Sequence, residues 1–122
     1  MRYDQLEAYK VPYKLALAVH KVSAGIAKEE RYGGFVSQIR RSSTSVCANI
    51  AEGLSKYMAS EADERRFLAM ALGSLEEMRF WLSFGRDVGY LDAEYVENAL
   101  KDYEYAAKLL FGLMQRRKGK AT

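Results

Sequence analysis

The residues best suited to bind a ligand lie in one stretch of the chain, residues 38–52. Its polar side chains recur at intervals of three and four, so they share one stripe if the stretch is helical. They are Gln38, Arg41, Ser45, Asn49 and Glu52. Arg40 lies beside them, and the planar forks of two adjacent arginines suit a phosphate group. Contact between Arg40, Arg41 and nucleic acid is therefore one interpretation of this stretch.

A structural role is the other interpretation of the stripe, and we favour it. Its partner would be a later helix that carries Ser74, Glu76 and Glu77, where Gly73 would let the two backbones approach. Either glutamate could accept hydrogen bonds from Arg40 or Arg41. A buried network fixes the register of two helices, because an unpaired buried member costs about 1–3 kcal/mol. The predicted network comprises Gln38, Arg41, Ser45, Asn49, Glu52, Ser74 and Glu77.

The residue inventory argues against catalysis. The chain has one histidine, His20, and one cysteine, Cys47, which lies among apolar residues as a core residue does. A carboxylate-bridged di-iron site needs two Glu-x-x-His pairs, and the sequence has no glycine-rich phosphate loop. An acid site built on Glu52, Glu76 and Glu77 with Arg41 would lack a nucleophile and a cofactor site. We therefore expect no enzymatic activity, no metal and no cofactor.

The positive charge of the chain is concentrated at its C-terminal end. The net charge is +3, yet residues 1–115 carry 15 Lys and Arg against 16 Asp and Glu. The excess comes from Arg116, Arg117, Lys118 and Lys120. A basic end of this kind can follow a phosphate backbone and release counterions, although cations at a helix C-terminus also suit the helix dipole. These four residues are candidate nucleic-acid contacts.

The spacing of apolar residues predicts an all-α protein. Four helices are expected, over about residues 8–28, 33–57 and 60–88, and from about residue 92 to the basic tail. The first follows a capping box at Asp4 and Glu7 and has Pro12 in its first turn, or an extended lead-in precedes Pro12. Ser60 caps the third helix and Gly89 ends it. The inward-facing residues are predicted to be Leu15, Ala18, Val22 and Ile26; Val36, Ile39, Ser43, Val46, Ile50 and Gly53; and Val96, Leu100, Tyr103, Ala107, Leu110 and Met114.

Short connections make an antiparallel, up-down-up-down four-helix bundle the economical fold. The third helix is apolar around its whole circumference at residues 67–72, and Phe80, Trp81 and Phe84 add to this excess. Such surface is covered either by a wide core or by another subunit, and we expect a homo-oligomer interface at these three aromatic residues.

The chain length of 122 residues allows one domain. We expect the bundle over residues 1–115 and a basic tail over residues 116–122. The chain has no apolar run of about 18 residues, no secretory signal at its start and a single cysteine. These features predict a cytoplasmic protein that does not enter the membrane.

Three segments resemble one bacterial family: QIRRSSTSVCANIAEG at 38–53, ALGSLEE at 71–77 and GYL at 89–91. They are similar to the four-helix-bundle proteins encoded in intervening sequences of bacterial large-subunit (23S) ribosomal RNA genes. The resemblance covers nearly the whole chain and rests most firmly on NIAEG at 49–53. It implies a bundle that assembles into a ring-like homopentamer with a link to RNA, and it implies no catalysis.

A shorter segment, MRFWL at 78–82, is similar to the accessory variability determinant of diversity-generating retroelements. That resemblance implies a basic barrel that binds a reverse transcriptase and nucleic acid. Two functions are therefore expected. The favoured one is an oligomeric scaffold that binds RNA or another polyanion, and the alternative is an adaptor that binds a protein such as a reverse transcriptase.

Overall fold

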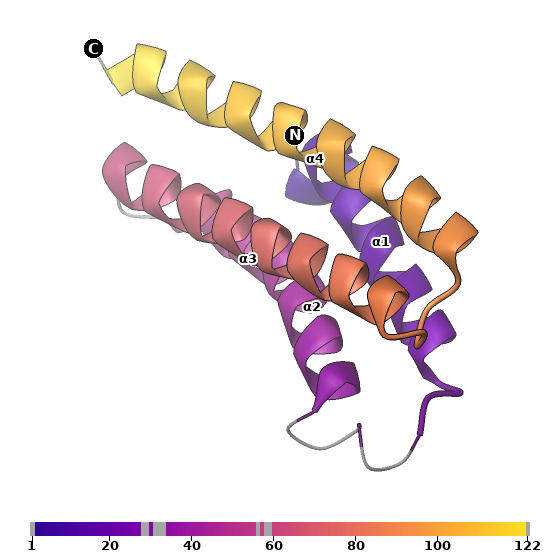
Figure 1. Cartoon of the computed structure of the whole chain (residues 1–122). Helices are drawn as coiled ribbons and strands as arrows, with labels where there is room; N and C mark the ends of the chain where they lie inside the picture. Colours follow the sequence, from indigo (N-terminus) through magenta and orange to yellow (C-terminus); the bar gives the residue numbers. More distant parts are fainter. Residues whose placement is uncertain (1, 28–29, 31–33, 56, 58–59, 122) are drawn as a thin grey trace.

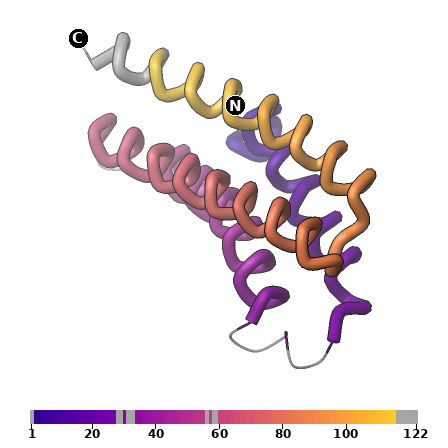
Figure 2. Tube along the Cα trace, viewed as in Figure 1, coloured from indigo at the N-terminus to yellow at the C-terminus, as the bar shows by residue number. Residues whose placement is uncertain are grey.

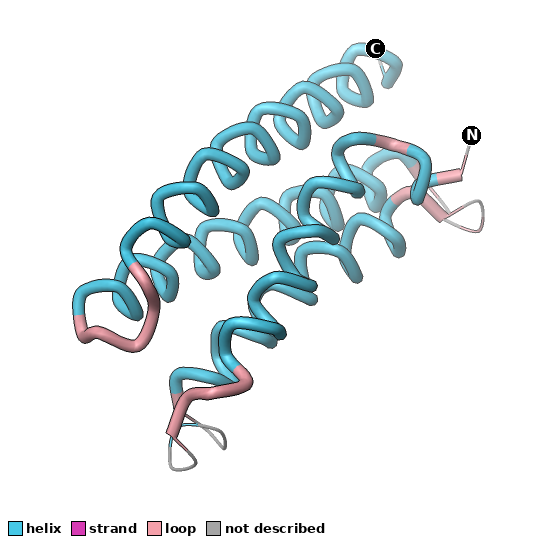
Figure 3. Tube along the Cα trace, turned by 90° about the vertical axis from the view of Figure 1, so that its right-hand side faces the viewer, coloured by secondary structure: helices cyan, strands magenta, loops and turns pink. Residues whose placement is uncertain are grey.

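The computed structural model describes residues 2–27, 30, 34–55, 57 and 60–121, with side chains as far as residue 115. These residues form helices, turns and loops, with no strand among them (Figure 3). A 3-10 turn, η1 (Tyr3–Gln5), precedes the helices α1 (Glu7–Ser23), α2 (Phe35–Gly53), α3 (Glu61–Asp87) and α4 (Ala93–Ala121). The prediction of an all-helical chain with four main helices is confirmed.

The four helices enclose one core (Figure 1). Helix α1 packs against α2 and α4, and α3 packs against the same two helices. Figure 2 traces the chain from η1 through the four helices to the end of α4. The turn η1 lies against α1 and α2. The core is built from apolar side chains of all four helices. Those that are almost completely buried include Val19, Ile39, Val46, Ile50, Leu68, Leu75, Met78, Leu82, Val96 and Leu110.

Helices α2 and α3 agree best with the prediction. All six residues predicted to face inward from α2 are buried. The Ser60 side chain accepts a hydrogen bond from the Asp63 backbone N–H at 3.1 Å and so caps α3. At the other end, Gly89 has a φ of 85°, which favours glycine, and the chain turns there. Local capping and turn chemistry therefore fix both ends of α3.

The start of α1 differs from the prediction of a capping box. Asp4 lies in η1 and pairs with Arg2 at 3.3 Å, while the N-cap of α1 is Leu6, which has no side-chain capping bond. The 3-10 turn places Asp4 too far upstream to cap the helix. Pro12 lies inside α1 rather than in its first turn, and its ring is fully buried. Burial of the ring offsets the hydrogen bond that a proline removes.

The inward faces of α1 and α4 are rotated from the predicted ones. In α1, Leu15 is buried, but Val22 is 36% exposed and Val19 takes its place in the core. The helix ends at Ser23, earlier than predicted, because residues 24–26 form a turn. In α4, Val96 and Leu110 are buried as predicted, whereas the other four predicted residues are half-buried. Small side chains replace them at the centre, since Ala99 and Ala106 are buried with Leu113.

Glycine allows close packing of α2 on α3, but at a different position from the predicted one. A Cβ atom on Gly53 would lie 2.8 Å from the Cβ of Phe67 and 3.3 Å from the Glu64 carbonyl oxygen. A Cβ on Gly73 would have nothing within 4 Å, and Gly73 is exposed. The prediction that Gly73 lets the helices approach is therefore wrong, because this residue faces away from α2.

These two glycines make a matched pair for a stability test. Gly53→Ala is expected to lower the free energy of unfolding by about 1–3 kcal/mol, because the new methyl group overpacks the helix contact. Gly73→Ala is expected to raise it by about 0.5–1 kcal/mol, because alanine favours the helix. Urea unfolding followed by circular dichroism measures both. A stabilising Gly53→Ala variant would contradict the close packing described above.

Candidate functional site

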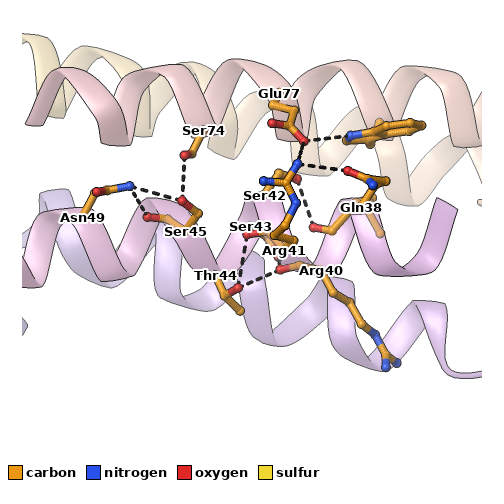
Figure 4. A network of polar contacts seen from close by, with 12 residues as sticks. Gln38, Arg40, Arg41, Ser42, Ser43, Thr44, Ser45, Asn49, Ser74 and Glu77 are labelled. Carbon is orange, nitrogen blue, oxygen red and sulfur yellow. Dashed lines mark hydrogen bonds and ion pairs between the residues drawn. The ribbon is translucent and has the colours of Figure 1, made fainter. Parts of the chain in front are cut away.

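The polar stripe of α2 faces α3, and an ion pair lies at its centre (Figure 4). The Arg41 guanidinium donates from Nη2 to Glu77 Oε2 on α3 at 2.8 Å and to Gln38 Oε1 at 3.0 Å. The two charged side chains are 62% and 37% exposed. The pair therefore joins α2 to α3 at the surface, where water and salt weaken the attraction.

A hydroxyl pair continues this contact farther along the same two helices (Figure 4). Ser45 Oγ on α2 lies 2.9 Å from Ser74 Oγ on α3. Asn49 donates from Nδ2 to the Ser45 carbonyl oxygen at 2.9 Å and to Ser45 Oγ at 3.2 Å. Asn49 thus orients Ser45 within α2 and does not itself reach α3. Short side chains can bridge the helices here because the backbones lie close together.

Glu52 is the member of the predicted network that the structure leaves outside it. Its side chain is exposed, and no hydrogen bond joins it to the other described residues. It borders a groove at the end of α2 with Arg2 and Tyr3 of the N-terminal segment. Glu52 therefore lies on the face of α2 toward the N-terminal segment, whereas the next residue, Gly53, packs against Phe67 of α3.

Arg40 and Arg41 point to different helices, so they do not form one phosphate-binding pair. Arg40 donates from Nε to Ser23 Oγ at 2.8 Å and from Nη2 to the His20 carbonyl oxygen at 3.0 Å. Both acceptors lie in the last turn of α1, where backbone carbonyl groups lack N–H partners in the next turn, and Ser23 Oγ itself donates to the His20 carbonyl oxygen at 3.3 Å. Arg40 therefore holds the C-terminal end of α1 against α2.

The hydroxyl residues beside the stripe bond within α2. Ser42 donates to the Ile39 carbonyl oxygen at 3.1 Å, and Ser43 donates to that of Arg40 at 3.1 Å. Thr44 donates to the Arg40 carbonyl oxygen at 2.9 Å. Ser42 and Ser43 are buried, so these bonds satisfy their hydroxyls within α2 without a partner from α3, whereas Thr44 is exposed.

An aromatic cluster on α3 adjoins the ion pair between Arg41 and Glu77. Phe80 and Phe84 are 56% and 40% exposed, whereas Trp81 is half-buried and donates from Nε1 to Glu77 Oε2 at 3.2 Å. The Phe80 and Phe84 rings stack with centroids 6.0 Å apart. Phe35 and Tyr90 extend the cluster from α2 and from the turn before α4. The spacing of residues along the sequence did not predict Phe35 and Tyr90 as part of this cluster, because helical spacing relates only residues of the same helix.

The predicted tail contacts lie outside the described side chains. Helix α4 continues as backbone across the predicted boundary at residue 115 to Ala121. The side chains of Arg116, Arg117, Lys118 and Lys120 are outside the described part of the chain.

The acidic residues considered for catalysis point apart. Glu77 turns to Arg41 on α2, whereas Glu76 accepts a hydrogen bond from the Tyr103 hydroxyl on α4. Burial, followed by this bond to Glu76, raises the pKa of Tyr103 to about 12. Burial raises the pKa of the Cys47 thiol to about 11, so the thiol is protonated at neutral pH and is a poor nucleophile. Within the described part of the chain, no three His, Cys, Asp or Glu residues cluster as metal ligands do.

Comparison with known proteins places this arrangement in a family. The model of the 23S rRNA-intervening sequence protein family matches residues 4–112, which contain all of the polar stripe and the aromatic cluster. The chain belongs to this family. The match confirms the resemblance inferred from the 38–53, 71–77 and 89–91 segments.

A solved structure supports the same assignment. The fold is similar to that of a protein with unknown function from the S23 ribosomal protein family of Bacteroides thetaiotaomicron VPI-5482, with a TM-score of 0.78. The two sequences are 26% identical, and the match covers 88% of this chain and 95% of the other. The comparison with curated proteins finds no match. Among the described helices, none combines the length and apolar character needed to cross a membrane.

The different positions of Glu77 and Glu52 lead to a test of the network. Glu77→Ala is expected to lower the free energy of unfolding by about 1 kcal/mol, because it removes the acceptor shared by Arg41 and Trp81. Glu52→Ala is the control and is expected to change it by less than about 0.5 kcal/mol. Urea unfolding followed by circular dichroism measures both. Equal losses in the two variants would contradict the network described here.

Proposed function

We propose that this family member is a non-enzymatic, cytoplasmic scaffold that assembles as a ring-like homo-oligomer and binds RNA or another polyanion. Each subunit is an antiparallel, up-down-up-down bundle, and a pentamer is the expected ring. Binding is electrostatic and has little sequence specificity. The observation that carries the proposal is the exposed aromatic surface of Phe80 and Phe84 on α3.

The aromatic surface supports assembly because it is contiguous. Phe80 contacts both Trp81 and Phe84, at ring-centroid distances of 4.9 Å and 6.0 Å. Aromatic residues are enriched at the centres of protein interfaces, and contiguous apolar surface on a small domain is typical of an association site. The ion pair of Arg41 and Glu77 borders this surface and forms a polar rim for the interface.

Assembly also supports polyanion binding. One subunit has a net charge of +3, with four cations among its last seven residues. Repeating these cations around a ring brings several basic ends to one particle, so their attractions for a phosphate backbone add together. A catalytic role has less support, because Glu76 and Glu77 bind different helices and the Cys47 thiol is protonated.

The assembly is tested by removing the exposed rings. The double variant Phe80→Ser and Phe84→Ser is expected to convert the oligomer into monomers, because its subunits lose the apolar centre of the interface. Phe111→Ser is the control, since Phe111 on α4 is 57% exposed and Phe80 is 56% exposed. Native mass spectrometry at several concentrations reports the subunit number. A wild-type monomer, or a double variant with the wild-type mass, would overturn the proposed interface.

Polyanion binding is tested through its dependence on salt. Affinity for a structured ribosomal RNA fragment is expected to fall steeply between 50 and 200 mM salt, because bound cations release counterions. A variant with Gln at positions 116, 117, 118 and 120 should bind more weakly and show a shallower salt dependence, by up to about 3 in the logarithmic slope. Affinity that neither change alters would refute the electrostatic mechanism. A protein partner retained after nuclease treatment would favour the adaptor instead.

A further inference from the structure

The two sides of the bundle differ in charge, although residues 1–115 are almost neutral overall. Helix α1 carries three lysines and one glutamate, and its neighbour α2 carries two arginines and one glutamate. Helix α3 carries six acidic and four basic residues, and residues 93–115 of α4 carry four acidic and two basic residues. By this count the side formed by α1 and α2 is positive, and the side formed by α3 and residues 93–115 of α4 is negative.

The lysines of α1 are the cations of this positive side that are free to bind a ligand. Lys10, Lys14 and Lys21 are exposed, and none of them takes part in an ion pair with another described residue. The arginines of α2 are already engaged, because Arg40 binds the end of α1 and Arg41 binds Glu77. Lys10 and Lys14 are four residues apart, so they lie about 6 Å apart along one face of the helix.

A row of tyrosines runs beside these lysines. The Tyr9 and Tyr13 rings stack with centroids 5.5 Å apart and an interplanar angle of 24°, and Tyr3 meets the edge of Tyr9 at 5.1 Å. Tyr13 is 47% exposed and Leu17, one turn later, is 56% exposed. Both border an apolar groove of about 240 Å³ between α1 and α2, which His20, Thr44 and Cys47 also line.

We propose that this groove binds single-stranded RNA. An unpaired base stacks on the exposed Tyr13 ring, and Lys10 and Lys14 contact the phosphates on either side of it. Single-stranded nucleic acid is commonly bound in this way, by aromatic rings that stack with bases inside a basic groove. The inference rests on the proposed RNA-binding function and assigns a surface to it, separate from the tail.

Lys10 and Lys14 do not line the groove but lie beside it on the exposed face of α1, and they argue against a second copy of the chain as its occupant. Lysine is depleted at protein interfaces, because burying an unpaired ammonium group is costly. The aromatic surface centred on Phe80 has acidic neighbours instead, because Glu76 and Glu77 lie one turn before it on α3. The aromatic surface of α3 therefore suits another subunit, whereas the tyrosine groove suits a chain of phosphates and bases.

Binding of a fluorescently labelled ten-nucleotide oligoadenylate to the full chain, followed by anisotropy, tests this site. Tyr13→Ala is expected to weaken binding by about 5- to 100-fold, because it removes the stacking of one base. Tyr105→Ala is the control, since Tyr105 on α4 is also 47% exposed, and it should bind as the wild type does. Lys10→Gln with Lys14→Gln should weaken binding, whereas Lys101→Gln with Lys108→Gln on α4 should not.

A competitor without bases separates stacking from charge. An abasic oligonucleotide of the same length should displace the labelled RNA from the wild type much less effectively than unlabelled oligoadenylate does. Circular dichroism and native mass spectrometry of each variant report its fold and subunit number. Wild-type protein that binds no oligoadenylate would overturn this site, and if it also bound no structured RNA the proposed function would fail with it. Wild-type binding with equal affinity in the Tyr13 and Tyr105 variants would overturn the groove alone, as would a changed subunit number in Tyr13→Ala.

Discussion

The close contact of α2 with α3 is the constraint on which the other features depend. Gly53 meets Phe67 at one end of this contact, and at the other end a Cβ on Gly85 would lie 2.6 Å from the Phe35 ring. Between them the backbones are near enough for Ser45 and Ser74 to touch through their hydroxyls. Longer side chains at these positions would force the helices apart, because a packed interface has little spare volume.

That contact divides the polar residues of α2 between two neighbours. Arg41 turns to α3, where Glu77 also holds the Trp81 indole, and Arg40 turns to the end of α1. Both arginines thereby tie elements of the bundle together. The surfaces that remain available to partners differ in their chemistry. Exposed aromatic rings lie on α3, whereas exposed lysines lie beside tyrosines on α1.

Prediction from the sequence succeeded where local chemistry fixes the structure. The Ser60 cap, the turn at Gly89 and the three- and four-residue spacing of α2 depend on neighbouring residues, and all are observed. It failed at the start of α1, where a 3-10 turn displaces Asp4 from the capping position. The inward face of α1 was also misplaced, because a helix between two neighbours buries a broad stripe, and Val19 rather than Val22 lies at its centre.

The sequence by itself determined the helical class, the family and the set of polar residues on α2, because periodicity and motifs are properties of the chain. Only the tertiary structure decided which helix each of these residues meets. Successive side chains on a helix point about 100° apart, so adjacent residues such as Arg40 and Arg41 reach different neighbours. Tertiary packing also separated the charges, since a nearly neutral body acquires a positive and a negative side only when α1 packs on α2 and α3 on α4.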